Sequence, residues 1–203
     1  MDAIIKYLKD RYEPLSIVVY GSYADGSRNM NSDFDALVIS NGQETVHDVG
    51  YVEGIQLDVF VYPHTYFHDD VDLNEFIQIF DGQIVFDTEN RGLVLKQKVL
   101  DYIESIPPKS KEEIQNSVAW CKKMLLRVGR HDTEGMFRWH WVLVDSLEIF
   151  CDAVHHFYHG PKKALKWMEA EYPNAFDLYQ NALFRFDEES LSNWIHYLEK
   201  QIS

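Results

Sequence analysis

The chain is poor in cysteine and in basic residues. Its 203 residues include only two cysteines, Cys121 and Cys151, so a disulfide framework and a CxxC metal-binding pair are both excluded. Lys and Arg total 19 against 33 Asp and Glu, which gives a formal net charge of −14. Because nucleic-acid binding needs basic side chains that neutralise phosphates, this balance argues against a nucleic acid as the partner. A small molecule or a cationic partner suits a chain with this charge better.

Long apolar runs are also missing. No uninterrupted apolar segment is long enough to cross a bilayer, and the first ten residues carry charges throughout, unlike a signal peptide. We therefore expect a cytoplasmic protein with no membrane partner. What the chain does have is 46% hydrophobic and 14% aromatic residues, which is typical of a folded globular protein. Its length allows one large domain or two small ones.

The most informative stretch runs from residue 17 to residue 39. An apolar segment at 16–20 ends at Gly21-Ser22, and a polar loop then leads through Asp33 to a second apolar segment at 34–39. A glycine-serine corner after a buried strand presents backbone N–H groups and a hydroxyl, and a helix start there would add positive potential. The sequence therefore predicts that Gly21 and Ser22 bind phosphate.

Two aspartates follow this corner at strand spacing. Side chains alternate along a strand, so Asp33 and Asp35 are expected to point to the same side. Neighbouring carboxylates repel each other, and either a shared proton or a divalent cation relieves the repulsion. A hard ion such as Mg²⁺ takes oxygen ligands, often one or two carboxylates together with substrate phosphates. Phosphate-binding and metal-binding groups are thus predicted side by side.

The pattern Gly21-Ser22, ten intervening residues and Asp33-Phe34-Asp35 resembles the nucleotidyltransferase superfamily that includes DNA polymerase β. Members of that superfamily carry Gly-Ser, an Asp-x-Asp pair and a third carboxylate on a neighbouring strand of a small mixed sheet. Asp58 is the candidate for the third carboxylate, because it is central in the alternating segment 54–62 and would be costly to bury unpaired. The resemblance implies that Asp33, Asp35 and Asp58 hold one or two Mg²⁺ ions.

The resemblance also implies that Gly21 and Ser22 hold the phosphates of an NTP, for which ATP is expected. One position departs from the family pattern, since many relatives carry an arginine three residues after the serine, where this chain has Asp25. Arg28 is the candidate to supply that cation to the phosphates. The alternative for Arg28 is an ordinary solvated loop residue.

The second part of the chain is predicted to be helical. A polar crossover at 87–92 places the domain boundary, giving a nucleotidyltransferase domain at 1–92 and a helical bundle at 93–203. Ser110 and Glu113 form a capping box that predicts a helix from 111 to about 128. A helix from about 134 to 158 carries an apolar stripe, and Glu148 lies on its opposite side. Glu148 either belongs to a solvated face or accepts a proton from an acceptor hydroxyl.

The expected fold class is therefore α+β, a small mixed β-sheet with flanking helices followed by an all-α bundle. The bundle, with the motif at 157–163, resembles the C-terminal helical domain of small antibiotic-type nucleotidyltransferases, the kanamycin and lincosamide enzymes among them. This implies Mg²⁺-dependent transfer of a nucleoside monophosphate to a hydroxyl of a small-molecule acceptor, with an antibiotic as one candidate, by a monomer or a homodimer. Two alternatives remain: an antitoxin-like minimal nucleotidyltransferase that modifies or binds a protein partner, and a pseudo-enzyme without activity.

Overall fold

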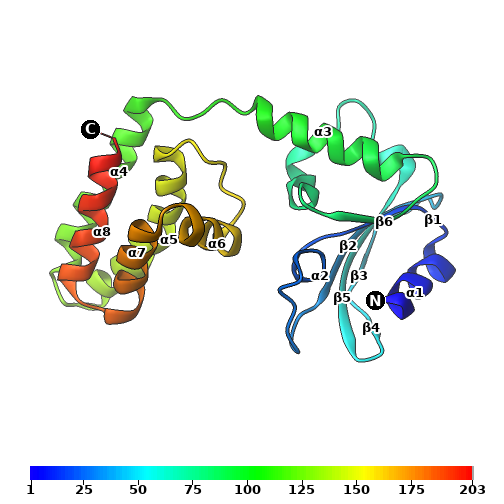
Figure 1. Cartoon of the computed structure of the whole chain (residues 1–203), viewed down its shortest axis with the longest axis horizontal. Coiled ribbons are helices and arrows are strands. Elements are labelled where there is room, and N and C mark those ends of the chain that lie inside the picture. Colours follow the sequence, from blue (N-terminus) through cyan, green and yellow to red (C-terminus); the bar gives the residue numbers. More distant parts are fainter. Residues whose placement is uncertain (203) are drawn as a thin grey trace. The chain divides into compact units, whose positions relative to one another are not determined.

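The computed structural model describes residues 1–202 of the chain (Figure 1). The chain divides into two compact units, Met1–Ile106 and a second unit that begins at Pro107. The first unit contains a sheet with helices on its faces, and the second is built from helices. The α+β fold class predicted from the sequence is confirmed.

The sheet of the first unit is mixed. Its strand order is β3-β5-β2-β1-β6, and β4 pairs with β5. β2 and β5 run parallel, and the other pairs are antiparallel. The strands span Pro14–Val19 (β1), Phe34–Ser40 (β2), Val46–Asp48 (β3), Tyr51–Val52 (β4), Ile55–Pro63 (β5) and Gln83–Asp87 (β6).

Alternation along the strands divides the apolar side chains of the sheet between two cores. On one face, α1 (Asp2–Tyr12) packs Ile4 and Leu8 against strand residues such as Val59. On the other face, the 3-10 helix η2 (Leu73–Ile79) and α3 (Arg91–Ser105) cover residues such as Leu37. α1 and α3 accordingly lie on opposite sides of the sheet (Figure 1). Two short helices, α2 (Ser22–Asp25) and the 3-10 helix η1 (His64–Tyr66), connect the strands.

Helix α3 belongs to the first unit. The sequence placed the domain boundary at residue 92, whereas the two compact units meet between Ile106 and Pro107. Leu95 and Val99 of α3 are buried in the core that covers the sheet, and Lys96 Nζ donates to the carbonyl oxygen of Gly82 at 2.6 Å. The apolar face of α3 therefore covers the sheet and is not the first element of the bundle.

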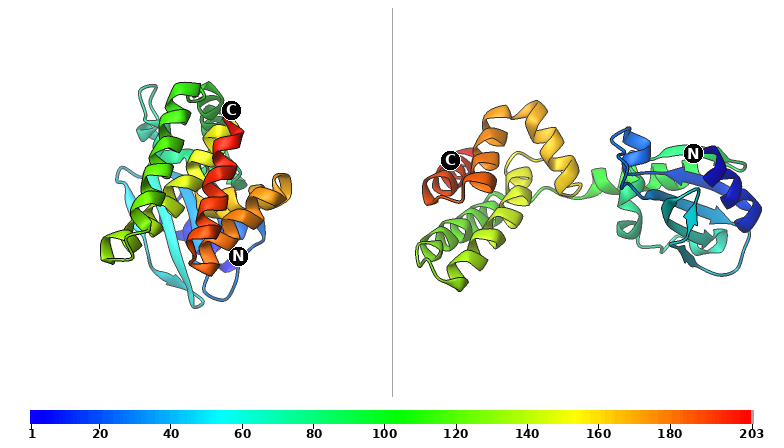
Figure 2. Two further views of the ribbon diagram at one scale, coloured as in Figure 1. Left: turned by 90° about the vertical axis from the view of Figure 1, so that its left-hand side faces the viewer. Right: turned by 90° about the horizontal axis from the view of Figure 1, so that it is seen from below.

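Residues 107–202 of the second unit form five helices, and α4 packs beside α5 and α8 (Figure 2). Their core contains Leu143, Leu147 and Phe150 of the predicted apolar stripe together with Trp194. Within residues 1–202, none of the helices combines the length and the apolar character that a bilayer crossing requires. The helices span Lys111–Val128 (α4), Thr133–Ala153 (α5), Pro161–Glu171 (α6), Pro173–Arg185 (α7) and Glu188–Gln201 (α8).

The ends of α4 and α5 test two predictions made from the sequence. The capping box at the start of α4 is confirmed, because Glu113 N donates to Ser110 Oγ at 3.3 Å and Ser110 N donates to Glu113 Oε2 at 2.8 Å. The end of α5 was predicted near residue 158 and lies at Ala153. There the chain turns, since His155 adopts a left-handed conformation with a φ of 56°.

Candidate active site

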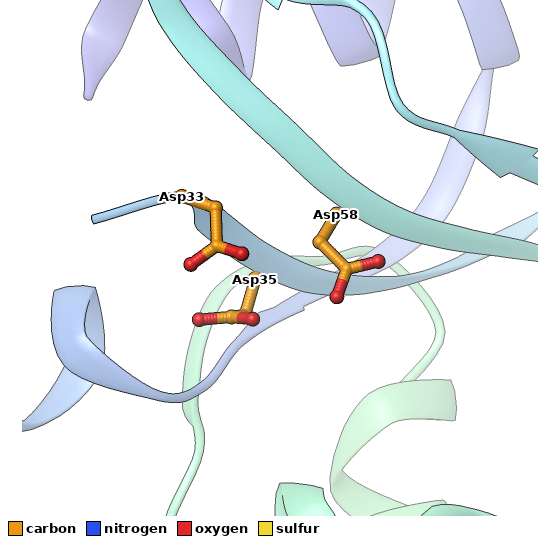
Figure 3. A group of neighbouring side chains, drawn as sticks. All are labelled: Asp33, Asp35 and Asp58. Atoms are coloured by element: carbon orange, nitrogen blue, oxygen red, sulfur yellow. The ribbon is translucent and has the colours of Figure 1, made fainter. Parts of the chain in front are cut away.

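Strands β2 and β5 bring three aspartates together. Their parallel register sets Asp35 opposite Asp58, and Asp33 lies just before β2. One carboxylate oxygen from each of the three lies within 4.8 Å of the other two (Figure 3). Asp33 is exposed, while Asp35 and Asp58 are half-buried. Three converging carboxylates open to solvent form a donor set of oxygens only, which suits a hard divalent cation.

Gly21 lies directly against this cluster. Its backbone has a φ of 63° and a ψ of −148°, a conformation that residues with a side chain rarely adopt. A Cβ atom added at Gly21 would overlap Oδ2 of Asp35. The corner is also tied to β2, because Tyr20 N donates to the carbonyl oxygen of Asp35 at 3.1 Å. Conformation and space thus both require glycine here, and the glycine-serine corner lies beside the carboxylates as the sequence suggested.

Ser22 follows at the start of α2 with its hydroxyl turned inward. The side chain is buried, and its Oγ has no hydrogen-bond partner within residues 1–202. A buried hydroxyl without a hydrogen-bond partner is unfavourable, so such a group in a native structure usually binds a water or a ligand. Ser22 Oγ is therefore a candidate to bind an oxygen of a phosphate group.

Two further residues at the site were missed by the sequence reasoning. His47 Nε2 lies 2.6 Å from Asp58 Oδ1, and the imidazole stacks on Phe60. Tyr20 ends the apolar segment before Gly21, and its side chain is buried. Burial raises the pKa of the Tyr20 hydroxyl, and the charges of Asp35 and Asp58 raise this pKa further. The hydroxyl therefore stays protonated near the triad at neutral pH.

Arg28 lies in the loop between α2 and β2. Its guanidinium group is exposed and lies 5.4 Å from the centre of the Tyr23 ring. The loop lines a pocket of about 610 Å³, whose walls include Arg28, Ser32, Tyr51 and Gln56. Ser32, which lines the pocket, directly precedes Asp33 in the chain, while the three aspartates themselves do not line it. Amide and hydroxyl groups therefore line this pocket.

Glu148 lies in the second unit, on the exposed side of α5. Lys109 Nζ is 3.7 Å from Glu148 Oε1 and donates to Asp152 Oδ2 at 2.7 Å. Glu148 also lines a pocket of about 430 Å³ together with Asp145 and Trp120. Its ion pair is one that a solvated helix face commonly carries, and its role as a proton acceptor stays a prediction.

The mixed sheet sets the glycine-serine corner against three aspartates, which is the arrangement that the resemblance to nucleotidyltransferases implied. Residues 1–121 match the family model described as the nucleotidyltransferase domain. Because this match covers more than half of the 203 residues, the chain belongs to the nucleotidyltransferase domain family. The superfamily resemblance predicted from the sequence is confirmed, while the resemblance to the antibiotic-type enzymes stays a prediction.

The solved structures that are similar to the chain include two of low identity. The crystal structure of a toxin-antitoxin with AMP-PNP is 21% identical, covers 51% of this chain and 86% of its own, and has a TM-score of 0.36. A nucleotidyltransferase-like protein from Exiguobacterium sibiricum 255-15 is 13% identical, covers 99% of this chain and 72% of its own, and has a TM-score of 0.43. At these TM-scores neither structure bears on the function. No curated protein matches the chain.

Proposed function

We propose that the chain is a Mg²⁺-dependent nucleotidyltransferase that transfers a nucleoside monophosphate from an NTP to a hydroxyl of a small-molecule acceptor and releases pyrophosphate. ATP is the expected donor. The observation that carries the proposal is the convergence of carboxylate oxygens from Asp33, Asp35 and Asp58 within 4.8 Å of one another. Membership of the nucleotidyltransferase family supports the reaction class.

The residues of the triad fit a divalent cation. They supply only oxygen ligands, and a cation bound between them would relieve the repulsion among three carboxylates. Asp33 and Asp35 would hold the cation against the triphosphate, and Asp58 would face a second cation or the acceptor. When bound, Mg²⁺ neutralises charge that develops on the leaving pyrophosphate and lowers the pKa of the attacking hydroxyl.

The glycine-serine corner would bind the triphosphate. Without a side chain at Gly21, the corner can lie directly against the carboxylate of Asp35, so its backbone N–H groups would be close to a phosphate beside the triad. The buried hydroxyl of Ser22 would donate to one of these oxygens and so gain the partner that it lacks within residues 1–202. Arg28, from the loop that follows α2, would add positive charge on the same side.

The acceptor would enter the pocket that is lined by the loop leading to Asp33. Its volume of about 610 Å³ is within the range of roughly 300–1,000 Å³ found for small-molecule sites. Side-chain amides and hydroxyls, such as those of Ser32, Tyr51 and Gln56, line it and suit a hydroxylated molecule. With a single cation bound, Asp58 would accept the proton of the attacking hydroxyl.

The proposal is tested by incubating the full chain with each labelled NTP, Mg²⁺ and a panel of aminoglycosides, lincosamides and hydroxylated metabolites, followed by mass spectrometry. We expect one class of acceptor to gain the mass of one nucleoside monophosphate, with pyrophosphate release that EDTA abolishes. Addition of the nucleotide only to a co-purifying protein chain would favour the antitoxin-like alternative. Absence of Mg²⁺-dependent NTP binding would refute the proposal.

A further inference from the structure

His47 is held by two contacts at the edge of the sheet. It lies on β3, whose antiparallel register with β5 sets His47 opposite Phe60. Its imidazole stacks on the Phe60 ring, with the centres 4.1 Å apart and the planes 8° from parallel. Its Nε2 lies 2.6 Å from Oδ1 of Asp58, two residues before Phe60 on the same face of β5. The stack sets the plane of the imidazole, and the hydrogen bond sets the direction in which Nε2 points.

The direction of the hydrogen bond follows from the chemistry of its two groups. An ionised carboxylate can only accept, so Nε2 of His47 carries the hydrogen and donates it to Asp58. Hydrogen bonds to a charged group are shorter and stronger than those between neutral groups, in agreement with the distance of 2.6 Å. With Oδ1 anchored, the carboxylate of Asp58 has a fixed plane and presents its other oxygen in a defined direction.

Asp58 needs such an anchor because it lies in a repulsive and partly open environment. Its side chain keeps 38% of its surface exposed, so rotation into solvent is sterically open to it. The carboxylates of Asp33 and Asp35 lie within a few ångströms and favour that rotation. The donor on His47 opposes it, and the stack on Phe60 favours the ring position from which His47 donates.

We propose that His47 is a positioning residue, which holds Asp58 in the orientation in which this carboxylate binds the divalent cation. The inference rests on the proposed function, because it assigns the cation to the triad. Residues that hydrogen-bond a metal ligand from behind typically contribute about 10–100-fold to metal affinity or activity. Removing the donor of His47 should therefore weaken cation binding by about that factor.

The experiment measures Mn²⁺ binding to the full chain through the loss of the free-ion EPR signal, without nucleotide and with a non-hydrolysable NTP analogue. His47→Phe keeps a ring to stack on Phe60 and removes the donor, whereas His47→Gln keeps a donor and removes the ring. We expect His47→Phe to raise the Mn²⁺ dissociation constant about 10–100-fold. His47→Gln should restore part of the affinity. In His47→Phe, the fold-decrease in kcat should be larger than the fold-increase in KM for the NTP.

His68→Phe is the matched control, since His68 lies in the loop beyond the far end of β5 and should bind Mn²⁺ like the wild type. Wild-type affinity in His47→Phe would overturn the inference while leaving the proposed function intact. Equal losses in His47→Phe and His47→Gln would also overturn it, because the donor would then not be the decisive group. Absence of Mn²⁺ binding by the wild type would overturn both the inference and the metal assignment of the proposed function.

Discussion

Replacing Gly21 with alanine tests the contact between the glycine-serine corner and the triad. Gly21 has a φ of 63° and a ψ of −148°, close to a region of backbone conformation that only glycine occupies readily. Forcing alanine into such a conformation costs about 1–3 kcal/mol. The new methyl group would also overlap Oδ2 of Asp35, so this carboxylate must move or the corner must shift away.

Two separate effects are therefore expected from Gly21→Ala. The strain should lower the free energy of unfolding by about 1–3 kcal/mol. Each kcal/mol lowers Tm by about 4–8 °C in a domain of about 100 residues, the size of the unit Met1–Ile106 that contains Gly21. Displacement of Asp35 should abolish nucleotide transfer even at temperatures where the variant is fully folded, because the carboxylate is part of the proposed metal site. Circular dichroism and pyrophosphate release measure the two effects independently.

Gly26→Ala is the matched control. Gly26 also has a positive φ, 76°, but a Cβ atom placed on it would meet nothing within 4 Å. It should therefore lose a similar amount of stability, about 1–2 kcal/mol, and retain transfer when folded. If Gly21→Ala transfers nucleotide as well as Gly26→Ala does, the close contact with Asp35 has no part in the reaction and our account of the corner is refuted.

Three further predictions concern the triad, the helical core and the cysteines. Asp35→Asn should abolish transfer without loss of the fold, measured by pyrophosphate release and thermal unfolding; activity in this variant would remove the metal assignment. Ser146→Ala should lower the free energy of unfolding by about 1–3 kcal/mol, because the buried Trp194 Nε1 that donates to Ser146 Oγ at 2.8 Å loses its acceptor; an unchanged urea midpoint would contradict this. Burial raises the pKa of Cys121 and of Cys151 to about 12, so both thiols should resist a thiol reagent at pH 8 until the chain unfolds. Since the unfolded thiols ionise from about pH 8.5, stability should fall as the pH rises from there towards 12, and a flat profile in urea titrations would be inconsistent with buried thiols.

The sequence predicts the centre of the sheet well because long strands leave a clear periodic signal. Strands β1, β2 and β5 were expected at 16–20, 34–39 and 54–62, close to their observed spans. The period of two along a strand also predicts that Asp33 and Asp35 point to one side, whereas Asp58 was expected beside them from the resemblance to the superfamily. The capping box of α4 was equally readable, because a helix start depends on residues that are adjacent in the chain.

Features that depend on distant contacts were not predictable in this way. Strands β3 and β4 have three and two residues, too few to show alternation, so the position of His47 beside Asp58 was not found. The pairing of β3 with β5 creates that contact across the sheet. In the same way, the helical pattern of α3 does not reveal which core the helix covers. The boundary between the units therefore lies after Ile106 and not at residue 92, where the sequence placed it.

Because side chains alternate between the two faces of the sheet, the triad depends on the number of residues in β5 that pair with β2. Removing one residue of β5 ahead of Asp58 would turn each remaining side chain of that stretch to the opposite surface. The carboxylate of Asp58 would then enter the apolar layer that contains Ile4 and Leu8, and a hydrophobic neighbour would take its place beside Asp35. Deletion of one residue in this strand should therefore lower the free energy of unfolding as well as abolish transfer, whereas replacement of Asp58 alone should affect transfer without loss of the fold.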